Sequence, residues 1–199
     1  MNGHALHPLM ARAATEAARI ARGVRPEQLD GPTPCAGFDT RTLVNHWVLY
    51  TSHGLEHRAL RKELPKDLTE HDFTTDPEWA DAYAAQLERA VAAWADPAVW
   101  EGDLDLGGSS MPATAIARML ILELVVHTWD VARATGQPSE VEDDLAVATV
   151  GLVEELAEMY RQYDGFAAPA AVPADASPLD RALAASGRDP QWASATASA

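Results

Sequence analysis

Residues 112–136 read PATAIARMLILELVVHTWDVARATG, and this stretch decides the fold class. The proline at its start and the glycine after its end favour a helix from Pro112 to Ala134. Between Met119 and Val126 the segment is apolar all round, which is typical of a helix that is buried on every side. We therefore expect a central helix, against which the rest of the chain packs.

The remaining sequence predicts further helices, separated by loops rich in proline and glycine. Alanine is abundant and no segment alternates apolar and polar residues, so a sheet-based fold has little support. The expected helices are Leu6–Arg22, Asp39 or Thr40 to Leu64, Asp76–Trp94, Glu142–Tyr160 and the short Pro178–Ala185; the main loops are Gly31–Gly37 and Asp96–Ser110, which holds Gly107 and Gly108. This order predicts an all-α antiparallel bundle with a short C-terminal appendage.

The chain shows no internal repeat and no change of composition that would divide it. We expect residues 1–190 to form one helical domain. Residues 191–199 end in small and polar residues, and we expect a disordered tail there.

The composition restricts the partners and the compartment. The 199 residues include 15 basic and 30 acidic side chains, a net charge of −15. Nucleic acids and anionic membrane surfaces are therefore not expected as partners, since both need a basic surface. The single cysteine, Cys35, allows no internal disulfide and fits a reducing compartment. We see no signal peptide and no apolar run of about 20 residues, so we expect a cytoplasmic protein.

Glu123 and His127 are the polar residues that the central helix carries within its apolar part. They are four residues apart and so lie about 40° from each other on one face. A buried carboxylate without a partner is costly, so something must compensate for its charge. A carboxylate and an imidazole at this spacing are a suitable half-site for zinc or a related dication. A third ligand would have to come from another helix.

The predicted second helix offers three histidines for that role. His46, His53 and His57 share one stripe with Tyr50. His46 and His53 lie about 10.5 Å apart along the axis, so both cannot bind one ion. The spacing leaves a choice between His46 and the pair formed by His53 and His57.

Other interpretations of these residues stay open at this point. Glu123 and His127 could form a hydrogen-bonded polar core without a metal. Asp130 could orient the His127 imidazole or pair with Arg133. Cys35 precedes a helix N-terminus, where a thiol can be activated, although a buried unreactive cysteine is the commoner case.

Three stretches of the sequence resemble a known family. They are PTPCAGFDTRTLVNH at 32–46, ELVVHTWDVARATG at 123–136, and the tail with VPADASPLDR at 172–181 and GRDP at 187–190. In this order they are similar to the DinB-like proteins related to mycothiol-dependent maleylpyruvate isomerase. The resemblance covers nearly the whole chain.

The resemblance implies a four-helix bundle that holds a divalent metal, zinc or nickel, between its helices. Mapped onto this sequence, the ligands are His46, Glu123 and His127, so the family pattern selects His46. Relatives use such a metal to bind a small thiol for isomerisation or S-transfer. The isomerase has a further C-terminal domain that contributes to its site, whereas this chain has only a short tail after Tyr163.

We therefore expect a metal-dependent thiol S-transferase or isomerase that acts on a small electrophile with a thiol such as mycothiol. Tyr50 and His53 would line the approach to the metal. The same open coordination position could instead activate water in a hydrolase. A non-catalytic protein that binds a metal or a small ligand is the third hypothesis. A homodimer is left open as an assembly.

Overall fold

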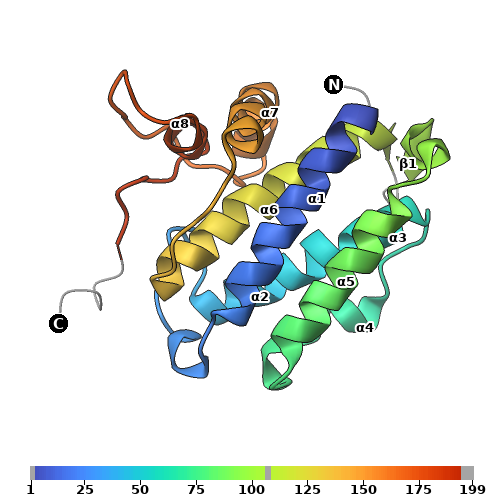
Figure 1. The fold of residues 1–199 in the computed structure, drawn as a ribbon, viewed down its shortest axis with the longest axis horizontal. Helices are drawn as coiled ribbons and strands as arrows, with labels where there is room; N and C mark the ends of the chain where they lie inside the picture. The colour runs from blue at the N-terminus through green and yellow to red at the C-terminus, as the bar shows by residue number, and fades with distance from the viewer. Residues whose placement is uncertain (1–2, 106–108, 194–199) are drawn as a thin grey trace.

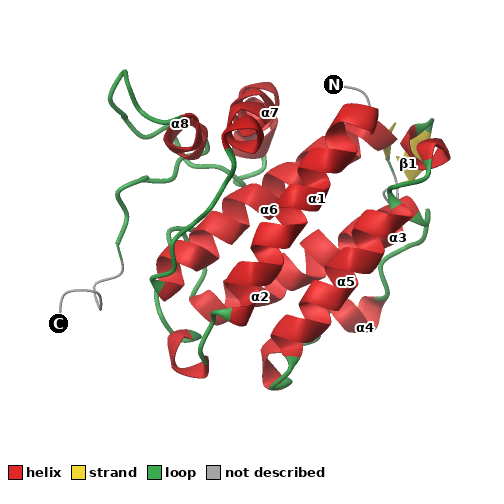
Figure 2. Cartoon of the chain, viewed as in Figure 1, coloured by secondary structure: helices red, strands yellow, loops and turns green. Residues whose placement is uncertain are grey.

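The computed structural model describes residues 3–105 and 109–193 (Figure 1). It is mainly helical (Figure 2), which confirms the all-α class. The α-helices are α1 (Gly3–Arg22), α2 (Thr40–Val48), α3 (Leu55–Ala59), α4 (Lys66–Thr69), α5 (Trp79–Ala93), α6 (Ala113–Thr135), α7 (Asp143–Gln162) and α8 (Pro178–Ala185). A π-helical segment, Leu49–Gly54, joins α2 to α3, and 3₁₀ turns cover Pro26–Gln28, Phe73–Thr75 and Pro97–Trp100.

The bundle consists of α1, α2 with α3, α5 and α6. In Figure 1, α1 lies between α5 and α6, while α2 packs on α6 and α3 on α5. The pairs α1–α5 and α2–α6 run antiparallel, as expected. By contrast, α6 runs parallel to α1, and α5 runs parallel to α3. The reason is the long connection from Leu60 to Glu78, which carries the chain back to the end of the bundle where α2 begins.

Helix α6 is the central helix that its sequence predicts. Ile121 and Leu124 are fully buried in the main core. Leu122 and Val126, on another side of the helix, are buried in a second and smaller core with residues of α7 and α8. The helix ends at Gly136, whose φ of 70° is readily adopted only by glycine. Because α6 is covered on two sides, a charged side chain on its buried faces needs a partner inside the protein.

The second helix differs from the sequence prediction. It starts at Thr40 as expected, with the side chain of Asp39 accepting a hydrogen bond from the Thr42 amide at 2.8 Å. It does not continue to Leu64, because the chain turns after Ala59 and Arg61 has a φ of 53°. The π-helical segment also interrupts it. An inserted residue of this kind rotates all the following side chains by about 100° relative to an unbroken α-helix.

The predicted loop before α6 contains a short hairpin. Strands β1 (Asp103–Asp105) and β2 (Ser110–Pro112) pair antiparallel, with Leu104 opposite Met111. Strands of three residues are too short to show the alternation by which a strand is recognised in a sequence. Gly107 and Gly108, which the sequence assigns to this loop, lie outside the described residues.

The C-terminal appendage, which consists of α7, α8 and the residues around α8 up to residue 193, packs on the outer side of α6. Helices α7 and α8 contact each other, and α7 contacts α6 (Figure 1). Helix α8 has the predicted bounds, and Ser177 caps it by accepting a hydrogen bond from the Asp180 amide. Residues 194–199, most of the predicted disordered tail, lie outside the described residues. The appendage therefore covers a flank of α6 that the bundle leaves open.

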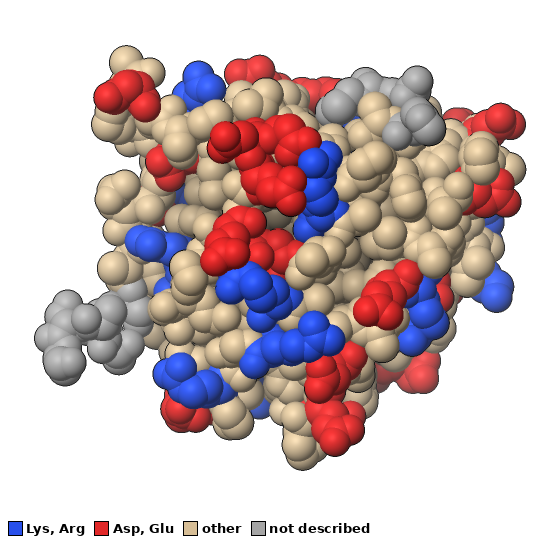
Figure 3. All heavy atoms as spheres, in the orientation of Figure 1, with Lys and Arg blue, Asp and Glu red and all other residues tan. Residues whose placement is uncertain are grey.

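Acidic and basic side chains are interspersed over the face shown in Figure 3. Exposed ion pairs on the molecule include Arg12 with Asp144 at 2.6 Å and Arg22 with Asp81 at 2.7 Å. Such pairs contribute less than about 1 kcal/mol each. Within residues 3–105 and 109–193, no helix is both long enough and apolar enough to cross a lipid bilayer.

Candidate metal centre

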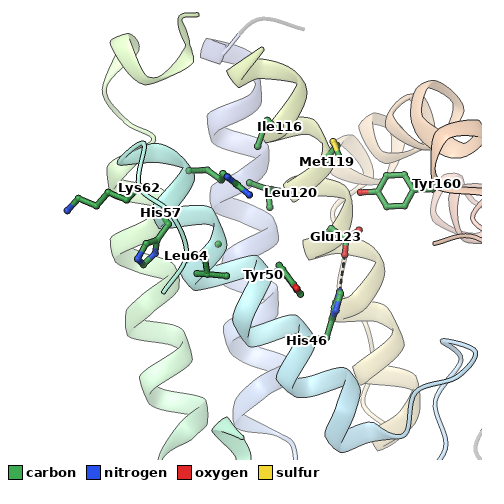
Figure 4. Close-up of a pocket in the computed structure, with 12 residues that line it drawn as sticks. His46, Tyr50, His57, Lys62, Leu64, Ile116, Met119, Leu120, Glu123 and Tyr160 are labelled. Carbon is green, nitrogen blue, oxygen red and sulfur yellow. Dashed lines mark hydrogen bonds and ion pairs between the residues drawn. The ribbon is translucent and has the colours of Figure 1, made fainter. Parts of the chain in front are cut away.

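Three side chains with nitrogen and oxygen donors meet between α2 and α6. His46 comes from α2, while Glu123 and His127 come from successive turns of α6. The Nε2 atom of His127 lies 3.0 Å from Oε2 of Glu123. The Nε2 atom of His46 lies 3.4 Å from the same oxygen, and Figure 4 shows this second contact as a dashed line. One donor atom of each residue lies within 4.8 Å of the others. The structure thus brings together the three residues that the family resemblance selects.

Buried charged side chains gather in this part of the interior, among them His127, Asp130 and Arg188. Burial opposes ionisation of Glu123, but the neighbouring His127 and hydrogen bonds from both imidazoles outweigh it and hold the pKa of the carboxyl far below its usual value. Burial also lowers the pKa of His127, but Glu123 and Asp130 more than offset this effect and raise it to about 9. The protonated His127 ring therefore lies between the carboxylates of Asp130 and Glu123. A dication that binds there can replace a proton of this ring.

Asp130 orients the His127 imidazole. Its Oδ2 atom lies 3.0 Å from Nδ1 of His127, and its side chain is fully buried. The alternative pairing of Asp130 with Arg133 is not formed, because Arg133 donates to the main-chain oxygen of Trp192. An ion that displaces the Nε2 proton would leave Nδ1–H bonded to Asp130 and the Nε2 lone pair directed to the side of Glu123.

Two cavities meet at two of the three donors, His46 and Glu123. One of about 370 Å³ lies between α2, α3 and the first half of α6 (Figure 4). The other, of about 780 Å³, lies between α6 and the appendage. Both are bordered by four of the same residues, namely His46, Met119, Glu123 and Tyr160. His46 and Glu123 therefore border both cavities, whereas His127 borders only the larger one.

Tyr50 and His53, which the sequence assigns to the approach, have different positions. Tyr50 lines the first cavity, next to His46, with a ring separation of 4.7 Å. His53 is stacked on Phe73 at 5.4 Å, and the structure does not bring it to the cavity that Tyr50 lines. The π-helical segment is the reason, because its extra residue rotates His53 away and places Gly54 on the wall instead.

The remaining candidate, His57, lines the same cavity farther from Glu123 (Figure 4). Its Nδ1–H donates to the main-chain oxygen of His53 at 2.8 Å, within the helix. The pair of His53 and His57 that the spacing left open thus does not face the two donors on α6. Of the three histidines, His46 is the one that does.

Two residues of this region were not identified from the sequence. Tyr160, on α7, lies beside Glu123, and burial together with that carboxylate raises the pKa of its hydroxyl, which stays protonated. Arg188, after α8, donates to Asp130 with 3.0 Å between Nη2 and Oδ2. Neither residue has a characteristic spacing to the α6 pair. The only signal in the sequence for Arg188 was the tail motif GRDP at 187–190, which belongs to the family resemblance.

Cys35 lies in the loop before α2, on the wall of the larger cavity. Burial, and then the negative charge of Asp130, raise the pKa of its thiol to about 11, although Arg188 at 3.6 Å from the sulfur opposes the shift. Burial and the acids thus outweigh Arg188, so the structure favours the unreactive cysteine over the activated one.

We expect the Cys35 thiol to react slowly with iodoacetamide. A pKa raised from 9.0 to about 11 leaves the thiol protonated throughout the neutral range, so the rate should rise with pH until about 11. At pH 7.5 this shift alone lowers the thiolate fraction by about a hundredfold. Mass spectrometry of chelator-treated protein measures the rate, and the same chain in urea is the control. Equal rates for folded and unfolded chain would contradict the assignment.

Comparisons with known proteins place the chain in a family. Residues 10–132 match the mycothiol maleylpyruvate isomerase N-terminal domain, and the chain belongs to this family. Two curated proteins of Mycobacterium tuberculosis, MT0763 of strain CDC 1551 and Rv0738 of strain H37Rv, are each 27% identical over 191 residues, which are 92% of this chain and 98% of theirs. Both carry the description "uncharacterized protein". No solved structure matches the chain.

Proposed function

We propose that the protein binds a divalent metal ion through His46, Glu123 and His127, and that it is a thiol S-transferase or isomerase for a small electrophile. The observation that supports this best is the convergence of the three donors beside two cavities, which share His46 and Glu123. The family supports the thiol, since its description names mycothiol and an isomerase. Zinc is the first choice of metal and nickel the second.

The donor set fits such an ion. Two imidazoles and one carboxylate are ligands that suit zinc and nickel. Three protein ligands leave one position open, which is the pattern of catalytic rather than structural sites. Asp130 adds the carboxylate that commonly holds a ligating histidine from behind. The bound set would carry a charge of +1, since the ion brings +2 and Glu123 −1, within a chain whose net charge is −15.

The chemistry that a bound ion supplies is a lower pKa for a thiol, so that a nucleophile exists at neutral pH. The protein's own residues shape the space around it. Ile116, Met119 and Leu120 form an apolar wall of the smaller cavity. The Tyr160 hydroxyl stays protonated beside Glu123 and can donate a hydrogen bond. Tyr50, 43% exposed, stands at the mouth of the cavity.

The test of this function is turnover that requires both the metal and a thiol. We expect zinc-loaded protein to consume mycothiol in the presence of a small electrophile, such as a chromogenic aryl halide or an α,β-unsaturated acid. His46→Ala should lose this activity, because a ligand is removed. His53→Ala is the matched control and should retain it, because His53 is stacked on Phe73 away from the donors. Thiol loss is followed colorimetrically.

Two other outcomes would contradict the proposal in different ways. Turnover of the electrophile at the same rate without thiol would instead support a hydrolase. Tight binding of zinc without turnover of any electrophile would support a binding protein.

A further inference from the structure

Arg188 is a buried cation that reaches α6 from the end of the appendage. Its side chain is 5% exposed, and it faces the fully buried carboxylate of Asp130. Its Nη2 atom lies 3.0 Å from Oδ2, and its Nε atom lies 3.4 Å from Oδ1. Two parallel contacts of this kind fix the orientation of a carboxylate as well as balancing its charge.

The same carboxylate holds His127. Its Oδ2 atom accepts from Arg188 and lies 3.0 Å from Nδ1 of His127. The other nitrogen of that ring, Nε2, lies 3.0 Å from Glu123. A chain of direct contacts therefore runs from Arg188 through Asp130 and His127 to Glu123.

The appendage holds Arg188 firmly in this position. The preceding residue, Gly187, has a φ of 85°, and a Cβ atom there would lie 2.7 Å from the Cβ atom of Ala167, so only glycine fits. The Arg188 amide donates to the main-chain oxygen of Leu183 at 3.0 Å. Its guanidinium lies 5.4 Å from the centre of the Phe166 ring.

Stability alone gives a weak reason for this arrangement. A buried ion pair adds little to stability, because desolvation offsets the attraction, and apolar residues of similar size often do as well. What the ion pair supplies, and an apolar pair would not, is an oriented carboxylate behind a histidine. Carboxylates in that position commonly raise the metal affinity of the site that they support.

We infer that Arg188 is a positioning residue of the metal centre: it orients Asp130, which in turn orients the His127 imidazole toward Glu123. The inference rests on the proposed function, since the centre that it serves is the proposed metal site. Arg188 lies beyond residues 10–132, which match the family. The appendage of this chain is thereby part of the centre rather than a cover over it.

The first test is the zinc affinity of Arg188→Met, measured by competition with a chromophoric chelator. We expect the affinity to fall by about 10- to 100-fold. Arg133→Met is the matched control, because Arg133 also links α6 to the tail, through Trp192, and also lies near an aromatic ring, yet does not bond to Asp130. Its affinity should equal that of the unmodified protein.

A double-mutant cycle shows whether Arg188 acts through Asp130. In an Asp130→Asn background, Arg188→Met should cause no further loss of zinc affinity, because the carboxylate that it orients is gone. Unchanged affinity for Arg188→Met, or the same loss in both backgrounds, would show that the inference is wrong. Should Arg188→Met fail to fold, Arg188→Lys keeps the charge without the two-pronged contact and should give an intermediate loss.

A second readout separates this inference from the proposed function. In chelator-treated protein, NMR of ¹⁵N-labelled histidine detects the Nδ1–H proton that His127 donates to Asp130. Arg188→Met should shift or broaden this resonance, and Arg133→Met should not. If the unmodified protein takes up no zinc, the proposed function fails, and this spectrum still decides the role of Arg188. An unchanged spectrum would overturn it.

Discussion

Replacing Glu123 by glutamine is expected to remove most of the affinity for zinc while the fold is retained. The amide has the same shape as the carboxylate, but it carries no charge and is a poor ligand for a dication. Structural zinc sites bind with about 10–16 kcal/mol over four ligands, which suggests about 3–4 kcal/mol for each ligand. The affinity should therefore fall on the order of a hundred- to a thousandfold.

Thermal unfolding with and without zinc measures this effect. An ion that binds only the folded state at 100 times its Kd stabilises the protein by about 2.7 kcal/mol, so the unmodified protein should melt at a higher temperature with zinc. Glu123→Gln should show no such shift. Glu56→Gln is the control, because the side chain of Glu56 is similarly exposed, 21% against 19%, but contacts Gln86 and Arg89. A full zinc shift in Glu123→Gln would refute the ligand assignment.

Replacing Asp130 by leucine is expected to lower the free energy of unfolding by about 3–5 kcal/mol, because it leaves a buried cation without its partner. The side chain of Arg188 is 5% exposed, so its unpaired charge would have little contact with water. Proteins of this kind are stable by roughly 5–15 kcal/mol in total, so the loss is a large share. Urea-induced unfolding of chelator-treated protein, followed by circular dichroism, measures it.

The matched variants distinguish a stranded charge from a simple loss of packing. Asp130→Leu combined with Arg188→Met should recover most of the stability, since the double variant has no buried charge. Asp81→Leu removes the acid of an exposed ion pair, in which the side chain of Arg22 is 52% exposed and that of Asp81 is 75% exposed. This substitution should lower the free energy of unfolding by less than about 1 kcal/mol. If the double variant is no more stable than Asp130→Leu, the unpaired cation is not the cause.

The local features of the fold and site were predictable because they depend on neighbours along the chain. The apolar run around Glu123 predicts a central helix that is buried on every side, and α6 is a central helix whose residues enter two cores. The spacing of Glu123 and His127 places both on one face of any α-helix, and their contact at 3.0 Å follows directly. The role of His46 as the third ligand came from the family resemblance, and it stays a prediction.

The position of His53 shows the limit of reasoning from spacing along one helix. The spacing from His46 to His53 predicts a shared face only if the helix keeps 3.6 residues per turn. The π-helical segment changes the number of residues per turn, so the residues after it face in other directions. The sequence from Leu49 to Gly54 contains no pattern that predicts such a segment. The long connection from Leu60 to Glu78 has a similar effect. It sets the relative direction of helices whose existence and bounds the sequence largely predicts.

The sequence by itself therefore determined the helical class, the central helix and the paired donors on it, since all three follow from periodicity within one segment. Only the tertiary structure decided how His46, Tyr160 and Arg188 are arranged around that pair. Arg188 is 58 residues away from Asp130 in the chain, yet their side chains lie 3.0 Å apart. No local rule links residues at such a separation, because their contact depends on how α7 and α8 pack against α6.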